Sequence, residues 1–315
     1  MTRMRDSVQQ QPKASGRKIW AGLNRPGTPS PDISILGLPY DGATCFRGGA
    51  AEAPERIRRL SAEIPPVLET GESLDTLSIR DDGDFFFGDD FVKAHPDIEK
   101  EVSGRIRSTF LLTLGGDHSV VIPVHRACSR QATAPVGLIF IDAHADLSDH
   151  FQGSPYSNAC PLRRAMDCGQ FSPRHTILVG TRCIEPEGLQ FIKKHQMKMF
   201  SAHEVAERGV RPIAQEIERI FSGLSNVYLS IDIDVLDPAF APGTGIPDAG
   251  GLTTRELITL IRALAPLPVV GADVVEVAPP LDVSDITSFA ALRVITALFG
   301  LVLHRKQKNE RFTLL

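Results

Sequence analysis

Carboxylate and imidazole side chains follow three apolar runs of the sequence, where they could bind metal ions or transfer protons. They are Asp117 and His118 after residues 109–114; Asp142, His144 and Asp146 after residues 136–141; and Asp232 and Asp234 in the run that begins at residue 228. Residues two apart on a strand point to the same face, so Asp232 and Asp234 are expected to face the same way. Two buried carboxylates side by side repel unless a cation compensates them.

The elements that must position these groups are strands separated by helices. Apolar runs predict strands at residues 33–38, 109–114, 136–141, 175–180 and 198–201, from residue 228, and at 268–275, with an edge strand within 74–85. Helices are predicted after Pro54 and at residues 211–221, 253–264 and 292–304. The alternation predicts an α/β fold with one mostly parallel sheet covered on both faces. Ligands bind such sheets at the carboxyl ends of the strands, where all three acidic segments lie.

Composition narrows the class of protein. The 315 residues are 42% hydrophobic and 23% charged, and the formal net charge is −4, which gives no electrostatic reason to expect nucleic-acid or membrane binding. Residues 1–32 are polar and rich in proline and glycine, so we expect an arm there and a single domain at 33–315. The arm lacks the apolar core of a secretion signal, which favours a cytoplasmic protein. The five cysteines lack the spacing of a disulfide framework or a zinc finger.

The number of candidate ligands favours two metal ions over one. A single histidine after a strand is usually a capped or solvated residue, but three such segments at one sheet edge are hard to attribute to packing. Two imidazoles and four carboxylates suit Mn²⁺, Ni²⁺ or a similar divalent ion. Six ligands would leave one ion no position for substrate, whereas two ions sharing carboxylates would keep room for water. Such ions lower the pKa of a bridging water, which predicts a two-metal hydrolase.

At these residues the sequence resembles the ureohydrolases, the family of arginase and agmatinase. The motifs are GGDHS, DAHAD, SIDIDVLDPAFAPGTGIPDAGG and GADVVEVAPP, and the resemblance extends over nearly all of the chain after the arm. It implies a three-layer arginase-like fold with a mostly parallel eight-stranded sheet. It also implies a binuclear Mn²⁺ site, or Ni²⁺ as in some members, and homo-oligomers that are trimers or hexamers.

The resemblance also implies roles for individual residues. One ion would be held by His118, Asp142, Asp146 and Asp232, and the other by His144, Asp142, Asp232 and Asp234, with Asp142 and Asp232 bridging. Asp146 would contact the hydroxide and carry its proton to the leaving nitrogen. Glu276 would pair with the substrate guanidinium, since a planar cation is best held by a bidentate carboxylate. Asp273 could support the site, while Asp117 and Asp237 are expected to order backbone.

One position departs from the family pattern. Agmatinases typically carry a histidine in the active-site mouth where this sequence has Asn158, in the run SNACPLRRA. An amide cannot relay a proton near neutral pH, although it can orient a guanidine nitrogen through hydrogen bonds. Residues 152–158 also offer no carboxylate or arginine for a charged substrate tail. The expected activity is hydrolysis of a guanidino compound to urea and an amine, and a substrate with a small or uncharged tail (guanidine itself, an alkylguanidine or a biguanide) is expected as much as agmatine.

Two alternatives remain open at this point. The same fold could hydrolyse an amide, as in the related zinc deacetylases, but those use a single metal with fewer ligands. The chain could also be a non-catalytic subunit that supports an active homologue in a hetero-oligomer. Metal stoichiometry separates the first alternative from the two-metal hydrolase, and turnover by the purified chain alone separates the second.

Overall fold

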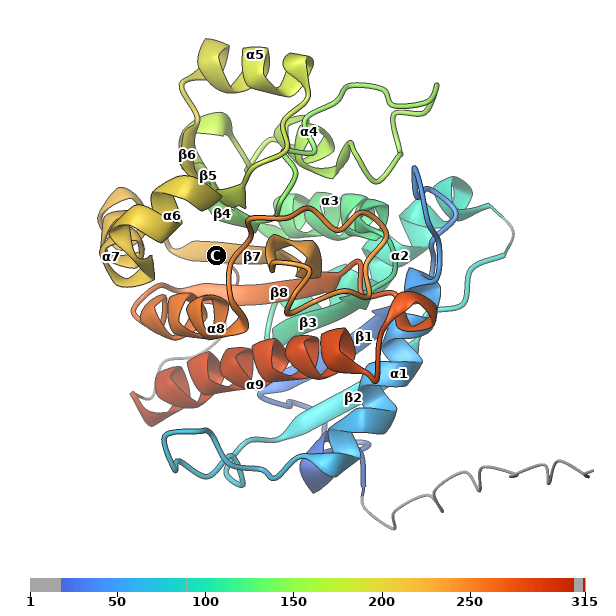
Figure 1. The fold of residues 1–315 in the computed structure, drawn as a ribbon. Helices are drawn as coiled ribbons and strands as arrows, with labels where there is room; N and C mark the ends of the chain where they lie inside the picture. Colours follow the sequence, from blue (N-terminus) through green and yellow to red (C-terminus); the bar gives the residue numbers. More distant parts are fainter. Residues whose placement is uncertain (1–17, 89, 309–313, 315) are drawn as a thin grey trace, which may run out of the picture.

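The computed structural model describes residues 18–88, 90–308 and 314, and an eight-stranded parallel sheet runs through its centre (Figure 1). The strand order is β2-β1-β3-β8-β7-β4-β5-β6, and each neighbouring pair is parallel. The strands are β1 (Ile33–Leu38), β2 (Ile79–Asp84), β3 (Phe110–Gly115), β4 (Val136–Ile141), β5 (Thr176–Thr181), β6 (Lys198–Ser201), β7 (Asn226–Asp232) and β8 (Val269–Val275). The predicted parallel sheet is confirmed.

Helices cover both faces of the sheet and bury two separate apolar cores. One layer contains α1 (Ala53–Leu60), α6 (Ala202–Arg208), α7 (Val210–Ile220), α8 (Thr254–Ala263) and α9 (Ile286–Gln307). The other contains α2 (Phe91–Ile106), α3 (Val121–Gln131), α4 (Pro161–Met166) and α5 (Pro186–His195). In Figure 1, α9 and α8 cross in front of the strands and α2 and α3 lie behind them. The central strands are therefore buried on both sides, which explains their continuous apolar runs.

Helix α9 is longer than the helix predicted at residues 292–304. Its 22 residues include an 18-residue window with a mean hydropathy of 2.0, so its length and composition would suffice to cross a membrane. However, 78% of that window is buried inside the protein. The helix packs on the sheet and on α1 and α8, and its apolar character is explained by this central position.

The start of the described chain packs onto the domain. Trp20 and Leu23 are buried in the core that contains α9, and the Trp20 ring lies edge-on to Phe299. The Trp20 indole also donates a hydrogen bond of 2.6 Å to Asp81 on β2. Residues 1–17 of the predicted arm lie outside the described residues, whereas this later part of it belongs to the folded domain.

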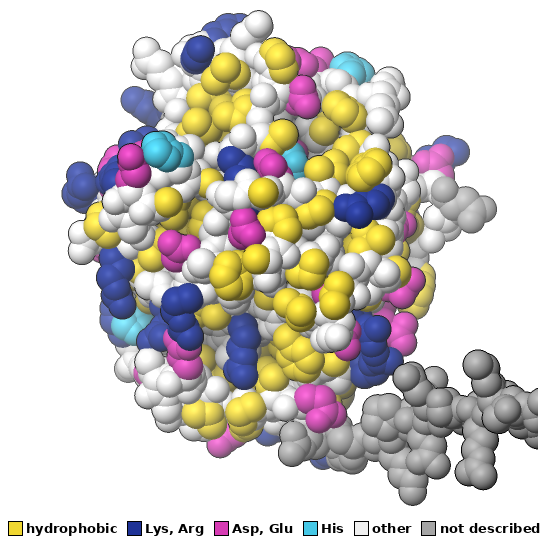
Figure 2. Space-filling model, in the orientation of Figure 1, with side chains coloured by type: hydrophobic (Ala, Val, Ile, Leu, Met, Phe, Trp, Pro, Cys, Tyr) yellow, Lys and Arg dark blue, Asp and Glu magenta, His cyan; other side chains and the backbone are white. Residues whose placement is uncertain are grey.

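The outer surface carries both signs of charge. On the face shown in Figure 2, basic and acidic side chains are interspersed, and no extended patch of one sign is visible among the coloured residues. This distribution agrees with the small net charge of −4 and offers that face no electrostatic footprint for a polyanion.

Two buried histidines make stability depend on pH. Burial lowers the pKa of His125 to about 3, and burial with the nearby Arg126 lowers that of His95 to about 4. Both therefore stay neutral in the folded protein and take up protons on unfolding. The stability that they contribute is complete above pH 6.5 and declines as the pH falls towards 4, by about 1.4 kcal/mol per pH unit for each histidine. Other buried groups titrate over the same range in the metal-free protein, so the part due to His95 is measured as the difference in free energy of unfolding between the wild type and a His95→Gln variant at pH 7, 6 and 5. A His95→Gln variant should lose less free energy of unfolding over that range than the wild type; an identical decline would contradict the assignment.

Candidate metal centre

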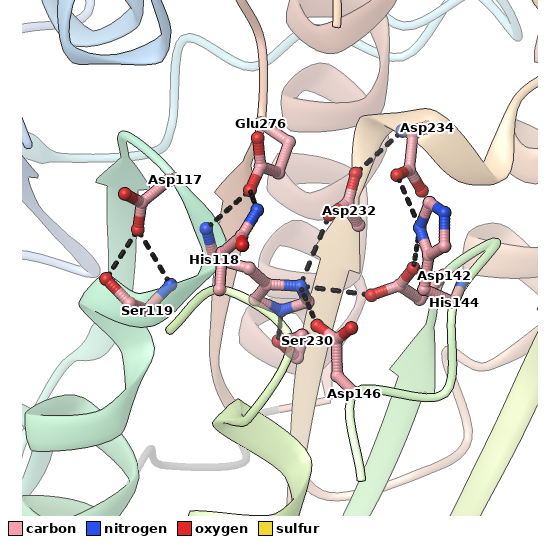
Figure 3. Close-up of polar contacts among 12 residues, drawn as sticks. Asp117, His118, Ser119, Asp142, His144, Asp146, Ser230, Asp232, Asp234 and Glu276 are labelled. Carbon is pink, nitrogen blue, oxygen red and sulfur yellow. Dashed lines mark hydrogen bonds and ion pairs between the residues drawn. The ribbon is translucent and has the colours of Figure 1, made fainter. Parts of the chain in front are cut away.

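Four adjacent strands bring the acidic segments to one edge of the sheet. His118 lies in a turn directly after β3, Asp142 follows β4, Asp232 ends β7, and Glu276 follows β8. These are the neighbouring strands β3-β8-β7-β4 at the centre of the sheet. Figure 3 shows their side chains pointing towards one another from separate strand ends. The structure confirms that the acidic segments predicted from the sequence converge at the carboxyl ends of the strands.

One cluster is centred on the ring of His118. Its Nδ1 atom lies 3.0 Å from Asp142 Oδ2, 3.1 Å from Asp146 Oδ2 and 3.2 Å from Asp232 Oδ2. Ligand atoms about 2.1 Å from a common ion and at right angles to one another lie about 3 Å apart. This spacing suits His118, Asp142 and Asp146 as ligands of one divalent ion, since their ligand atoms all lie within 4.8 Å of one another. Asp232, the fourth predicted ligand, is close to His118 but is not part of this mutually close group, so its role as a ligand remains a prediction.

A second cluster is centred on His144 and shares Asp142 with the first. The Nδ1 atom of His144 lies 2.9 Å from Asp234 Oδ2 and 3.6 Å from Asp142 Oδ1. Asp142 thus directs one oxygen to each histidine, as expected of a bridging ligand. Asp232, the other predicted bridge, directs Oδ2 to His118, while its Oδ1 accepts a 2.8 Å hydrogen bond from the amide of Asp234. Its bridging role remains a prediction.

Asp234 does not lie on the strand, which corrects one premise of the sequence analysis. Strand β7 ends at Asp232, and Asp234 lies in the 3-10 turn Ile233–Val235. Strand alternation therefore does not explain why the carboxylates of Asp232 and Asp234 lie close together. They meet because the turn folds the backbone amide of Asp234 onto Asp232.

Backbone amides orient three of these carboxylates. Oδ1 of Asp142 accepts from the amide of His144 at 2.6 Å, and Oδ1 of Asp234 accepts from the amide of Ala143 at 3.2 Å. Asp232 is held in the same way by the Asp234 amide. In each case the other oxygen is left to face the histidines, so the loop backbone preorganises the ligand set before any ion binds.

The residues fit a pair of divalent ions. His118 Nδ1 and Asp142 Oδ2 are buried and face each other at 3.0 Å, yet neither makes a hydrogen bond with the described residues. A buried polar atom without a partner is costly, and two such atoms aimed at a common point indicate a missing positive group. The donor set of imidazole nitrogen and carboxylate oxygen suits Mn²⁺, Ni²⁺ and related ions.

The pKa values of the clustered side chains also indicate that the site is suited to cations. Burial, together with repulsion from Asp234 and Asp142, raises the pKa of Asp232 well above its usual value. Burial and Asp142 raise the pKa of Asp146 to about 6. Burial opposes protonation of His118, but the close carboxylates of Asp142, Asp146 and Asp232 outweigh it and raise the pKa of His118 well above its usual value. Without ions the cluster must therefore retain protons, and divalent cations would replace them.

Glu276 lies across from the ion ligands and is held by two donors. Its Oε1 accepts a 2.8 Å hydrogen bond from the amide of His118 and a 3.0 Å hydrogen bond from the side chain of Asn158. Burial, and then Asp117, raise the pKa of Glu276 to about 8. The backbone φ angle of Glu276 is 61° and that of Asp146 is 49°. Such left-handed conformations cost about 1–3 kcal/mol in a non-glycine residue and are concentrated at functional sites.

Asn158 links Glu276 to the loop at residues 41–49. While its side-chain amide donates to Glu276, its Oδ1 accepts from the amide of Cys45 at 3.2 Å, and its own amide donates to the carbonyl of Ala43. The residue therefore lies in the predicted mouth, where it ties two pocket walls together.

A cavity of about 210 Å³ opens onto both ion clusters and Glu276. Among its lining residues are three that the sequence analysis did not assign to the site, namely Cys45, Cys183 and Glu185. Cys183 and Glu185 come from the segment after β5, where no motif of clustered ligands marks them. Cys160, by contrast, is fully buried and packs as a small core residue.

Two further aspartates order backbone, as predicted. Asp117 accepts from the amides of Ala43 and Ser119, at 2.9 and 3.0 Å. Asp237 accepts from the amides of Ala239, Gly250 and Gly251 at 2.7–3.2 Å. Neither is near enough to a histidine of the clusters to form an ion pair in the described structure.

Replacing Asp234 by asparagine should remove most of the metal bound near His144. The neutral amide loses the charge that offsets the ion, while the change in volume is small, so the fold should persist. Metal analysis after loading with Mn²⁺ and dialysis should show a loss of about one ion per chain with an unchanged circular dichroism spectrum. Asp237→Asn, which changes a nearby aspartate outside the clusters, should keep its metal. Wild-type metal content in Asp234→Asn would contradict the ligand assignment.

Comparison with known proteins places this centre in a known family. The sequence model of the arginase family matches residues 31–300. The chain is 34% identical to guanidinopropionase of Pseudomonas aeruginosa, covering 86% of both chains, and 36% identical to agmatinase of Proteus mirabilis, covering 86% and 87%. The solved structure of proclavaminate amidino hydrolase from Streptomyces clavuligerus superimposes with a TM-score of 0.85 at 33% identity, covering 93% of this chain and 99% of the other. The predicted arginase-like fold is thereby confirmed, and the chain belongs to the arginase family of metal-dependent amidinohydrolases.

Proposed function

We propose that this protein hydrolyses a guanidino compound with a short uncharged or cationic tail, agmatine or a smaller guanidine, to urea and an amine. The observation that carries the proposal is the cavity lined by Glu276 and by four of the six predicted metal ligands, His144, Asp146, Asp232 and Asp234, with the other two, His118 and Asp142, in contact with these residues. His118, Asp142, Asp146 and Asp232 would hold one ion, and His144, Asp142, Asp232 and Asp234 the other. A pair of divalent ions, when bound, activates water for attack on the guanidino carbon.

The protein's own residues orient the substrate and move the proton. Glu276 is fixed through Oε1 by His118 and Asn158, which leaves Oε2 for the guanidinium. A buried carboxylate binds this planar cation strongly and aims its carbon at the ion pair. Asp146, which lines the cavity beside the ion site, would accept a proton from the activated water and donate it to the leaving nitrogen.

The charge of the pocket supports a tail without a carboxylate. Within the described residues no lysine or arginine lines the cavity, and Glu185 lines it as an exposed carboxylate outside the ion clusters. An acidic tail would meet this like charge with no cation to compensate it. Guanidinopropionase, a relative by sequence, is named for a substrate that ends in a carboxylate. We infer that this chain differs from that relative in substrate range.

The metal and the assembly are parts of the same proposal. We infer two ions per chain, with Mn²⁺ the first choice and Ni²⁺ the second, because both accept mixed nitrogen and oxygen ligands. Exposed hydrophobic side chains include Phe46, Val283 and Ile286 at 69%, 57% and 45%, and contacts with a second copy of the chain would cover such groups. With the resemblance to the family, we infer a homo-oligomer, a trimer or hexamer, in the cytoplasm.

A urea-release screen of the purified, metal-loaded chain tests the activity. Agmatine or a small guanidine should be hydrolysed with a kcat/KM at least tenfold above that of guanidinobutyrate, guanidinopropionate and arginine, because their carboxylates face an acidic wall. Asp234→Asn serves as the inactive control. A preference for a guanidino acid would refute the tail assignment, and the absence of urea from every compound would refute the activity. One metal per chain would instead favour amide hydrolysis.

Glu185→Gln supplies the matched control for tail selection. The change removes a charge at an exposed position that contacts no ion ligand, so turnover of guanidine should stay within about twofold. The ratio of kcat/KM for guanidinobutyrate to kcat/KM for guanidine should be higher in Glu185→Gln than in the wild type. An equal ratio in the two proteins would show that another feature of the pocket sets the preference.

Asn158→Ala should weaken substrate orientation more than metal binding. Loss of the amide frees Glu276 from one of its two donors and unties the loop at Cys45, so KM for the guanidino substrate should rise about tenfold or more. Metal content should equal that of the wild type because Asn158 contacts no predicted ligand side chain. Kinetics with parallel metal analysis measure both quantities. An unchanged KM would argue against the orienting role.

A further inference from the structure

A buried hydrogen-bond chain runs from His118 into the sheet. His118 Nε2 lies 3.1 Å from Ser230 Oγ, and that hydroxyl donates to Asp273 Oδ1 at 2.8 Å. All three residues are at most 1% exposed. Ser230 has one proton, and because it donates that proton to the carboxylate, its oxygen can only accept from His118. The network therefore keeps a proton on Nε2, which makes Nδ1 the nitrogen that can bind an ion.

We propose that Asp273 is a positioning residue of the metal centre, which acts through Ser230 to fix the tautomer and ring orientation of His118. Nδ1 is the atom that faces Asp142, Asp146 and Asp232 at 3.0–3.2 Å. The inference rests on the ion pair proposed above, but it does not depend on which substrate the protein hydrolyses. According to this proposal, Asp273 determines how tightly the ion at His118 is bound.

Packing alone does not explain a carboxylate at this position. Asp273 lies on β8 between Thr113 of β3 and Ser230 of β7, its partners in register, and is completely buried. Its Oδ1 also accepts a weak 3.3 Å hydrogen bond from the amide of Ile231, but its Oδ2 has no partner among the described residues. Burying a carboxylate without full compensation is costly, so an apolar residue would serve packing better.

Several unpartnered polar atoms surround the far side of this carboxylate. His125 Nε2 lies 3.9 Å from Asp273 Oδ2, and the hydroxyls of Thr113 and Tyr228 are buried without a hydrogen bond to the described residues. These groups form a polar environment beneath Asp273 in an otherwise apolar layer.

The second histidine has no such support. His144 is 21% exposed towards the cavity, and its Nε2 makes no hydrogen bond with the described residues. The two ions should therefore respond differently to the same change. Loss of the Asp273–Ser230 chain should weaken the ion at His118 and spare the one at His144, a selectivity that general damage to the fold would not produce.

Metal binding by the full chain tests the proposal through Asp273→Asn and Ser230→Ala. Both variants are loaded with Mn²⁺ and dialysed, and metal content, chelator competition and electron paramagnetic resonance are measured. We expect one ion to bind about 10- to 100-fold more weakly, as for other partners of metal-bound histidines. Metal content should fall from two ions towards one, and the spectrum of a coupled Mn²⁺ pair should give way to that of an isolated ion.

Ser34→Ala is the matched control. Ser34 is a fully buried serine of β1 whose hydroxyl donates to Asp82 at 2.5 Å, so the same change is made far from the ions. This variant should keep both ions. Two tightly bound ions in Ser230→Ala and Asp273→Asn would overturn the proposal, as would equal loss of both ions or parallel loss in Ser34→Ala. Failure of the wild type to release urea while these metal results hold would refute only the proposed activity.

Discussion

Repulsion among buried carboxylates at the end of four central strands is the constraint on which the rest of the structure depends. A parallel sheet buried on both faces can bring Asp142 and Asp232 together only if their charges are compensated. Part of the compensation is built into the fold, because backbone amides of the following turns bond to one oxygen of each. The remainder requires cations, and this makes the metal centre a condition for a fully ionised site rather than an addition to a finished fold.

The predicted metal ligands and Glu276 are coupled through a single residue, His118. His118 presents its ring to the first ion cluster and its backbone amide to Glu276. A glycine immediately before Asp117 makes this arrangement feasible: the carbonyl of Gly116 accepts from the amide of Glu276, and a Cβ on Gly116 would lie 1.7 Å from the carbonyl oxygen of Tyr40. The distance between His118 and Glu276 is therefore set by backbone contacts, which tolerate little variation.

Much of this centre could be predicted from the sequence because its residues adjoin apolar runs. Strand ends are easily recognised, and side chains directly after them share one edge of a parallel sheet. The position of Asp234 was misassigned because the pattern does not distinguish the last residue of a strand from a following turn. Helix α2 was not predicted: Pro96 lies within it, although proline cannot donate the usual backbone hydrogen bond. Glu185 was missed because it reaches the pocket from a loop, and loops carry no periodicity.

The cavity walls and the predicted metal ligands come from different parts of the chain. Ligands project from the rigid ends of β3, β4 and β7, whereas Cys45, Asn158 and Glu185 come from surface loops. Loops accept substitution and changes of length more readily than buried strands do. Evolution could thus alter the preferred compound by editing the loops while the hydrolytic machinery stayed intact, which offers a physical reason why one scaffold can serve agmatine, guanidino acids and other amidino compounds in different bacteria.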